Sequence, residues 1–250
     1  RFEWHTMDSW HWGAEKAINY INQVCTALVV PAVSSEEEYR KRGVTRPIEV
    51  IPLGVDRNVY QPWGRDQVLL ERARWTTGPP GEEEFLFVVA GCLQTRKGVA
   101  ETLRAFKSAF SPDDRVALLF KNYVGAWAHQ THTLIGELNG PYRIGVHEEN
   151  ISDWAMARLL SSAECYVSAH RREGFGLVPL QAMSCGTPAI ITNWDGPLAY
   201  ATAQNSLLVD PAGFEKIEVP EARTSSEWAV IDTKALGAAM RKAFEMGRVS

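Results

Sequence analysis

The stretch from Glu173 to Thr192 constrains the fold of this chain more than any other part of the sequence. An apolar run predicts a strand that ends at Ser168. The acidic residue Glu173 and a Gly-x-Gly sequence follow, and we expect a turn there and then a short helix. Gly186 lies where a helix C-cap belongs, and Pro188 opens the next apolar run. Such a unit places a carboxylate and free backbone N–H groups at the carboxyl end of a sheet. A polyol that carries a phosphate suits this place, because the carboxylate accepts hydrogen bonds from hydroxyls and the helix N-terminus attracts the anion.

The rest of the chain alternates between apolar runs and helical apolar stripes. Residues 85–90 form a continuous apolar run, which is typical of a parallel strand buried on both faces. Strands that alternate with helices predict an α/β chain with a doubly wound, Rossmann-like parallel sheet. A serine of the pair Ser34-Ser35, Ser152 and Asp232 are expected to cap helices, whereas residues 211–231 are expected to be irregular. The expected strands are 27–33, 48–52, 85–90, 116–120, 142–146, 164–168, 189–192 and 207–209, and the expected helices begin near residues 14, 34, 66, 99, 126, 152, 177 and 232.

Polar clusters follow several of the expected strands. In an open α/β sheet the ligand lies outside the carboxyl ends of the strands, and these ends lie next to one another along one edge of the sheet. We therefore expect the clusters to converge on one crevice. They are residues 91–97, 121–122, 147–150, 170–176 and 193–197.

Composition and charge argue against several functional classes. The chain has 250 residues and a net charge of −4, so a general affinity for nucleic acid is not expected. No run approaches the roughly 18 apolar residues of a membrane span, and no secretory leader is recognisable. The pair His129 and His132 is a weak metal pattern, and no metal site is predicted. Four cysteines in apolar surroundings, without a C-x-x-C motif, predict buried, reduced thiols of a cytoplasmic protein: Cys25, Cys92, Cys165 and Cys185.

The stretch that begins at Glu173 resembles the donor-sugar motif of retaining glycosyltransferases of family 4 (group 1), which have the GT-B fold of two facing Rossmann-like domains. The motif of that family contains two glutamates separated by seven residues, within E-G-F-G-x-x-x-x-E-A-M-x-C-G-x-P-V. Here Glu173 fills the first position and Gln181 the second. Nearly every other residue matches over about sixteen positions, which is far more specific than an isolated Gly-x-Gly.

A second segment also resembles this family. Its members join their domains through an I-P-x-G-V-D segment followed by F-x-P, and residues 51–56 and 60–62 have this pattern. The resemblance predicts residues 1–50 as the tail of the N-terminal acceptor domain, 51–84 as a linker and 85–250 as the nucleotide-sugar-binding domain. Because members of the family are larger than this chain, we expect most of the N-terminal domain to be missing from it.

Arg96 and Lys97 precede Gly98 between an expected strand and an expected helix. Two cations at a helix N-terminus suit a diphosphate, although an isolated Arg-Lys-Gly is more often a solvated turn. The resemblance favours the diphosphate, because family members carry Lys-Gly at this turn and the lysine contacts the donor. Many members also have an arginine after the strand glycine, where this chain has Cys92 after Gly91. Arg96 could replace that cation.

The resemblance also implies roles for the signature residues. Glu173 would contact hydroxyls of the donor sugar, the alternative being an ordinary strand-end carboxylate that pairs with Arg171 or Arg172. Backbone amides of the Gly-Phe-Gly turn would contact the sugar or the phosphate. The implied catalytic residues are Lys97 and Glu173, and the implied donor-binding residues are Gly91, Arg96, Lys97, Gly98, Glu173, Gly174, Phe175, Gly176, Leu177 and Gln181.

Two departures from the family pattern leave alternatives open. Gln181 keeps a carbonyl acceptor for the nucleotide ribose but lacks the usual charge, so either ribose binding is weaker or the site is degenerate. Residues 193–197 replace a glycine-containing loop of the family, and Gly196 either offers its amide to phosphate or belongs to a plain turn. His170 is expected to have a packing role and not to act as an acid or base.

These expectations together describe the transfer of a sugar from a nucleoside diphosphate sugar to an acceptor, with retention of configuration. Lys97 would stabilise the leaving diphosphate without a metal or other cofactor, and Glu173 would orient the sugar. The acceptor, which could be a glycan, a lipid or a small molecule, and any peripheral contact with a membrane would belong to the missing domain. Two alternatives stay open: a nucleotide-sugar-binding domain without catalysis, and a nucleotide-sugar epimerase of the GT-B fold.

Overall fold

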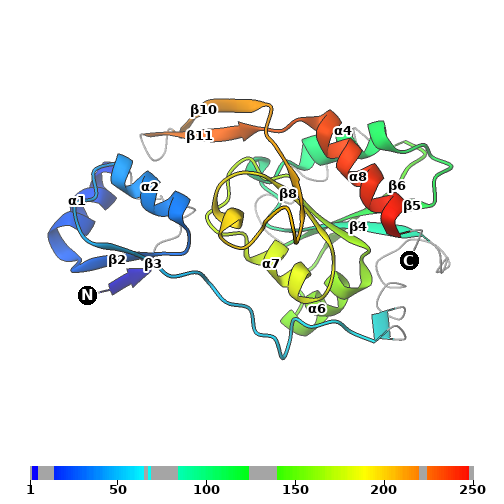
Figure 1. Cartoon of the computed structure of the whole chain (residues 1–250), viewed down its shortest axis with the longest axis horizontal. Helices are drawn as coiled ribbons and strands as arrows, with labels where there is room; N and C mark the ends of the chain where they lie inside the picture. Colours follow the sequence, from blue (N-terminus) through cyan, green and yellow to red (C-terminus); the bar gives the residue numbers. More distant parts are fainter. Residues whose placement is uncertain are drawn as a thin grey trace.

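The fold is described from a computed structural model of the chain, which describes residues 2–4, 14–64, 67–68, 84–123, 140–219 and 224–247. Its main part is a parallel sheet of six strands in the order β6-β5-β4-β7-β8-β9 (Figure 1). From β4 the chain adds strands toward one edge, and from β7 it adds them toward the other edge. The strands are β4 (Phe85–Gly91), β5 (Val116–Asn122), β6 (Arg143–Glu148), β7 (Cys165–Ser168), β8 (Ala189–Thr192) and β9 (Leu207–Val209).

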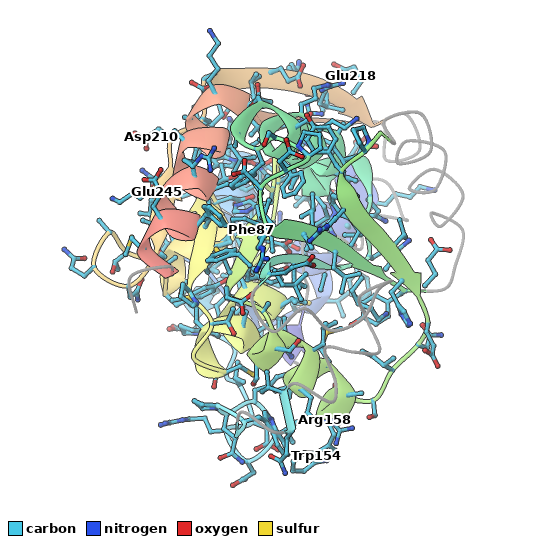
Figure 2. The ribbon with its side chains drawn as sticks, turned by 90° about the vertical axis from the view of Figure 1, so that its right-hand side faces the viewer. Phe87, Trp154, Arg158, Asp210, Glu218 and Glu245 are labelled. Carbon is cyan, nitrogen blue, oxygen red and sulfur yellow. The ribbon has the colours of Figure 1, made fainter. Side chains whose placement is uncertain are left out.

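Helices cover both faces of this sheet, as the continuous apolar run of β4 predicts. Phe85, Phe87 and Val89 pack with apolar residues of α4 and α8, while the alternate residues Leu86 and Val88 pack with those of α6 and α7. Figure 2 shows Phe87 in the interior between these layers. The predicted α/β fold class with a doubly wound parallel sheet is therefore confirmed. The helices are α4 (Val99–Ala109), α6 (Asp153–Ser162), α7 (Leu177–Ser184) and α8 (Thr233–Gly247).

A smaller parallel sheet near the N-terminus has its own apolar core. Its strands pair in the order β1-β2-β3, and Ile21, Leu28 and Tyr39 are buried together there, apart from the core of the large sheet. Figure 1 shows this part at the left of the view, joined to the large sheet by an extended segment that runs along the bottom. The elements are β1 (Phe2–Trp4), α1 (Ala14–Val24), β2 (Ala27–Val30), α2 (Val33–Lys41) and β3 (Ile48–Val50).

The extended segment, residues 51–64, is anchored on the large domain through Tyr60. The Tyr60 ring is buried against the layer of α6 and α7, and its hydroxyl donates a hydrogen bond to Asp153 at 3.0 Å. Ser184 in α7 donates to the Tyr60 carbonyl at 2.6 Å. The domain boundaries expected near residues 50 and 84 stay predictions.

The expectation that residues 211–231 are irregular is wrong. β10 (Gly213–Val219) and β11 (Thr224–Val230) form an antiparallel hairpin, which runs along the top of the view in Figure 1. Both strands are largely polar, with charged residues beside apolar ones, so they lack the clear apolar alternation that identifies a strand in sequence. The hairpin is instead held by the loop that follows β7. The Ala229 amide donates to the Arg171 carbonyl at 2.8 Å, and the Arg171 side chain donates through its Nε to the Ala229 carbonyl at 3.3 Å.

Two of the three expected helix caps are confirmed. The Ser152 hydroxyl accepts from the Ala155 amide at 3.3 Å, and Asp232 accepts from the amides of Lys234 and Ala235 at 2.9 and 3.0 Å. The serine cap expected at residues 34–35 is wrong, because β2 ends at Val30 and α2 already begins at Val33, with Ala32 as an N-cap that offers no side-chain acceptor.

Cys25, Cys165 and Cys185 are buried free thiols, but Cys92 is only half-buried, because it follows the end of β4 at the sheet edge. The expected helix at 126–138, most of the helical piece expected at 66–75, and the pair His129 and His132 lie outside the described residues.

Candidate functional site

The candidate site lies at the carboxyl ends of β4 and β7, the two central neighbours in the sheet. The chain reverses its direction of winding between these strands, so their crossover connections leave on opposite faces. In open α/β sheets this switch point is where a crevice forms and where ligands bind. Lys97 follows the first of these strands and Glu173 follows the second.

The turn after β4 places two cations against the turn after β7. A short 3-10 helix, η2 (Thr95–Lys97), ends at Gly98, which has a positive φ of 65°. A Cβ at Gly98 would overlap the backbone carbonyl of Ala169, so only glycine permits this close approach. The Arg96 carbonyl accepts from the Arg171 amide at 2.7 Å. Backbone contacts therefore determine the approach of the two turns, and the side chains follow.

Glu173 is paired with the cations of the neighbouring turn. Its carboxylate forms an ion pair with Lys97 and lies 3.4 Å from the Arg96 guanidinium. The residue is only 6% exposed. Burial would raise the pKa of the Glu173 carboxyl, but the charges of Lys97 and Arg96 outweigh burial and hold this pKa below its usual range. A charged carboxylate and two cations are thus held together at the switch point.

The alternative pairing of Glu173 with its neighbouring arginines is wrong. Arg171 forms an ion pair with Glu215 in β10, and the Arg172 guanidinium lies 3.6 Å from Asp195. Both arginines face away from the Lys97 turn, toward the hairpin and the loop after β8. Lys97 and Glu173 therefore meet as the motif implies, without competition from the adjacent arginines.

The Gly-Phe-Gly turn presents its backbone amides at the start of α7. Gly176 has a φ of 80°, which the helix start requires, and the Phe175 ring is buried at 5.3 Å from the Tyr200 ring. The amides of residues 174–177 donate to no acceptor within the described residues. Because the Phe175 side chain belongs to the core, only its backbone can serve a ligand. These amides and the N-terminus of α7 together form an anion-attracting edge.

Gln181 and Gly91 occupy the flanks of the site. Gln181 is half-buried one turn into α7, and its side chain makes no hydrogen bond with the part of the chain that the structure describes. Gly91 ends β4 with a φ of 134°, and a Cβ there would meet no atom within 4 Å. Space is therefore open at the end of β4, beside Cys92, the residue that stands in place of the family arginine.

The loop after β8 supports the signature turn, residues 173–176, and does not offer Gly196 to a ligand. The Gly196 amide donates to the Glu173 carbonyl at 3.0 Å, so the expectation that it could bind phosphate is wrong. Asp195 accepts from the Glu173 amide at 3.0 Å. The sequence carries no signal for these two contacts, because they depend on the path of a loop that belongs to another strand.

His170 is a packing residue, as expected. It is fully buried, its Nε2 lies 2.9 Å from the Trp194 carbonyl, and its Nδ1 lies 3.1 Å from the Ser168 hydroxyl. Burial lowers the pKa of His170, although the Trp194 carbonyl opposes this shift. The ring is therefore neutral near pH 7 and holds the loops after β7 and β8 together.

The outer strand ends join the same edge through their own contacts. Asn122 at the end of β5 accepts from the Leu93 amide at 3.1 Å and donates to Glu148 in β6 at 3.2 Å. Lys121 donates to the carbonyls of Asn122 and Glu149. The expected convergence of the strand-end clusters is thus observed, although these groups serve the sheet edge itself.

Two further findings concern the described residues only. Within them, no helix combines the length and the apolar character that crossing a bilayer requires. The same residues contain no group of three or more His, Cys, Asp or Glu side chains placed to hold a metal ion. The expected cytoplasmic location and the expected independence of cofactors stay predictions.

The doubly wound sheet with a switch-point site defines a Rossmann-like domain of the kind found in GT-B glycosyltransferases. The sequence model of the family "Glycosyl transferases group 1" matches residues 71–218. This chain therefore belongs to the group 1 glycosyltransferases.

Relatives and solved structures agree with this family. A GDP-mannose-dependent α-(1-6)-phosphatidylinositol dimannoside mannosyltransferase of Mycobacterium tuberculosis is 28% identical over 208 residues, covering 79% of this chain and 47% of that protein. A D-inositol 3-phosphate glycosyltransferase of Arthrobacter is 32% identical over 168 residues, covering 65% of this chain and 38% of that protein. The chain thus spans about half or less of the length of these curated relatives. Anabaena HepE, solved in complex with UDP and glucose, superposes with a TM-score of 0.75 at 16% identity, over 94% of this chain and 58% of that one.

Proposed function

We propose that this chain binds a nucleoside diphosphate sugar at the ends of β4 and β7 and supplies the donor-binding part of a retaining glycosyltransferase of family 4. The observation that carries this proposal is the contact of Lys97 and Arg96 with Glu173 across the switch point. A diphosphate needs the cations, a sugar needs the carboxylate, and both groups belong to one ligand.

The ion pair defines what the donor must exchange on binding. Without a ligand, Lys97 and Glu173 neutralise each other. When the donor binds, its diphosphate takes Lys97 and the free amides of residues 174–177, while sugar hydroxyls donate to the Glu173 carboxylate. Because both charges receive a new partner at the same time, neither is left buried and unpaired, and a complete nucleotide sugar is favoured over either half alone.

The chemistry follows from the charges. The bond between the anomeric carbon and the diphosphate oxygen breaks, the acceptor oxygen bonds to the same face of the sugar, and the departing diphosphate takes the acceptor proton. The transition state resembles an oxocarbenium ion. Lys97, with Arg96 nearby, stabilises the negative charge that develops on the diphosphate, so the step requires no metal. Glu173 orients the sugar, and Gln181 offers its amide oxygen to the ribose.

The relatives suggest which donors to test. The mycobacterial relative is named as GDP-mannose-dependent, and Anabaena HepE was solved with UDP and glucose and with UDP-glucose. The acceptor, to judge from the named relatives, is an inositol-containing lipid or small molecule. It would be bound by an N-terminal acceptor domain, of which we assign residues 1–50 as the tail, 51–84 as the linker and 85–250 as the donor-binding domain.

Titration calorimetry with UDP, GDP, ADP, UDP-glucose and GDP-mannose tests the proposal. We expect one nucleotide to bind and its sugar conjugate to bind more tightly. In Glu173→Gln the ion pair of Lys97 is removed, so the bare nucleotide should bind as well as before or better, whereas the added affinity from the sugar should fall roughly tenfold. Equal losses for nucleotide and nucleotide sugar would contradict the role of Glu173, and absence of binding to all five ligands would contradict the function itself.

A further inference from the structure

Asp195 has a backbone conformation that ordinarily belongs to glycine. Its φ is 64° and its ψ is −151°, and it is the single residue other than glycine with a positive φ in the described part of the chain. Side chains beyond glycine are strained in this region of the backbone map. The strain must be offset by contacts that the Asp195 side chain makes.

The Asp195 carboxylate binds the backbone of the signature turn. Asp195 is 6% exposed, and its Oδ2 accepts from the Glu173 amide at 3.0 Å. The next residue, Gly196, donates its amide to the Glu173 carbonyl at 3.0 Å. A Cβ at Gly196 would overlap the backbone of residues 173 and 174, so this loop lies directly against the turn. Both backbone polar groups of Glu173 are therefore held by two successive residues of one loop.

Arg172 supplies the opposite charge that a buried carboxylate needs. Its Nε lies 3.6 Å from Asp195 Oδ2, its Nη1 donates to the Glu227 carbonyl in β11 at 3.1 Å, and its Nη2 lies 3.8 Å from Glu38 in α2. Ser35, also in α2, donates to the Gly174 carbonyl at 3.4 Å. The support of the turn thus extends from the loop after β8 to the hairpin and to α2.

We propose that Asp195 is a positioning residue that holds the Glu173 backbone so that its carboxylate faces Lys97 and the donor sugar. This inference rests on the proposed donor-binding function. Asp195 itself faces the peptide of Glu173 and the Arg172 guanidinium, so it acts on the ligand only through Glu173. The strained conformation is kept because the same geometry brings the carboxylate to the amide.

Two substitutions of Asp195 distinguish the effect of its backbone strain from the effect of the hydrogen bond that its carboxylate accepts from the Glu173 amide. Asp195→Gly relieves the backbone strain but removes the acceptor, and Asp195→Asn keeps an acceptor oxygen while removing the charge. Asp232→Ala is the matched control, because Asp232 also accepts from backbone amides, at the start of α8 and outside the site.

Two measurements on these variants test the role. Hydrogen exchange at the Glu173 amide, followed by NMR, should become at least about tenfold faster in Asp195→Gly and stay within about threefold in Asp195→Asn. Calorimetry should show that the ratio of UDP-glucose affinity to UDP affinity, or of GDP-mannose to GDP, falls roughly tenfold in Asp195→Gly and is rescued in Asp195→Asn. Asp232→Ala should change neither the exchange of that amide relative to the global rate nor the affinity ratio.

Failure of the positioning role and failure of the proposed donor binding give different results in these experiments. Unchanged exchange at Glu173 in Asp195→Gly overturns the positioning role, and so does faster exchange with an unchanged affinity ratio. If the unmodified chain binds none of these donors, the proposed function fails, while the exchange measurement still decides whether Asp195 holds the Glu173 amide.

Discussion

Two lysines at the carboxyl ends of neighbouring strands have opposite surroundings. Lys97 follows β4, keeps part of its side chain in contact with solvent and forms an ion pair with Glu173. Lys121 belongs to β5, is 1% exposed and donates to backbone carbonyls, that of Asn122 at 2.7 Å and that of Glu149. A cation whose partner is a side chain can exchange that partner for a ligand, whereas a buried cation that donates to backbone carbonyls is part of the sheet edge.

The surroundings of Lys121 explain why its ammonium is not available to a ligand. Burial lowers the pKa of Lys121, and the charges of Glu149 and Glu148 oppose this shift. Its ammonium also lies 5.3 Å from the centre of the Tyr123 ring, which adds a cation–π contact. Strand-end position alone therefore does not identify a ligand-binding lysine, and the partners of each ammonium do.

The largest expected effect comes from breaking the contact that brings the Lys97 turn to β7. In Gly98→Ala the new Cβ would collide with the Ala169 carbonyl at a positive φ, so we expect a loss of about 4 kcal/mol or more in the free energy of unfolding. Gly54→Ala is the control, since a Cβ there meets no atom within 4 Å, and it should change stability by less than about 0.5 kcal/mol. Denaturant unfolding measures both. A stable Gly98→Ala chain with normal nucleotide binding would contradict the close approach of the two turns.

Replacing Lys121 should affect stability without affecting nucleotide affinity. Lys121→Met keeps the apolar stem but removes the ammonium donor from the carbonyls of Asn122 and Glu149, of which Asn122 is a buried residue, and this should cost about 1–3 kcal/mol in the free energy of unfolding. Nucleotide affinity of the folded chain, measured by calorimetry, should stay within about twofold of the original value. A selective loss of affinity in a chain of unchanged stability would break the distinction between the two lysines.

Replacing Lys97, unlike replacing Lys121, should weaken nucleotide affinity. In Lys97→Gln, affinity for the nucleoside diphosphate should weaken by about 1.5–3 kcal/mol, the scale of a hydrogen bond to a charged group. Stability should also fall, because Glu173 is left buried with Arg96 as its remaining cation. Adding Glu173→Gln should restore the stability but not the diphosphate affinity. Recovery of both quantities in the double variant would remove Lys97 from the ligand site.

The large sheet and the meeting of Lys97 with Glu173 could be predicted because they depend on strong, local signals. The seven-residue apolar strand β4, the stripe of α4 and the Ser152 cap are properties of short segments, and parallel topology then places the strand ends together. The motif resemblance added which side chains of those ends meet.

The hairpin and the role of Asp195 could not be predicted, because they depend on contacts made between distant segments. β10 and β11 are polar strands whose position follows from Arg171 and its neighbours, and hydrophobic periodicity does not report such contacts. Nothing in the letters of residues 193–197 indicates that an aspartate adopts a glycine-like backbone. Such a conformation follows from the approach of one loop to another, and it is visible only in three dimensions.

The smallest expected effect is a pH dependence of stability, which should differ between the buried neutral His170 and the buried ion pair of Glu173 with Lys97. Because burial lowers the pKa of His170 in the folded chain, this imidazole is protonated near pH 6.5 in the unfolded chain but is still neutral at that pH in the folded chain. Stability should therefore fall as the pH drops below 6.5, by at most about 1.4 kcal/mol per pH unit, until the folded-state pKa is reached. Glu173 acts in a lower window: its folded pKa lies below 4.5, so its contribution is lost only as the pH falls through that lower value.

Denaturant unfolding at pH 7.5, 6.5 and 5.5 measures the His170 contribution alone, as a difference between the original chain and His170→Gln. The variant should be less stable at pH 7.5, because it loses the fit between the loops after β7 and β8, but the difference between the two chains should shrink as the pH falls. Glu173→Gln should leave the slope between pH 7.5 and 5.5 unchanged. A slope that disappears in Glu173→Gln and persists in His170→Gln would mean that the charged pair, and not the buried imidazole, responds to pH in this range.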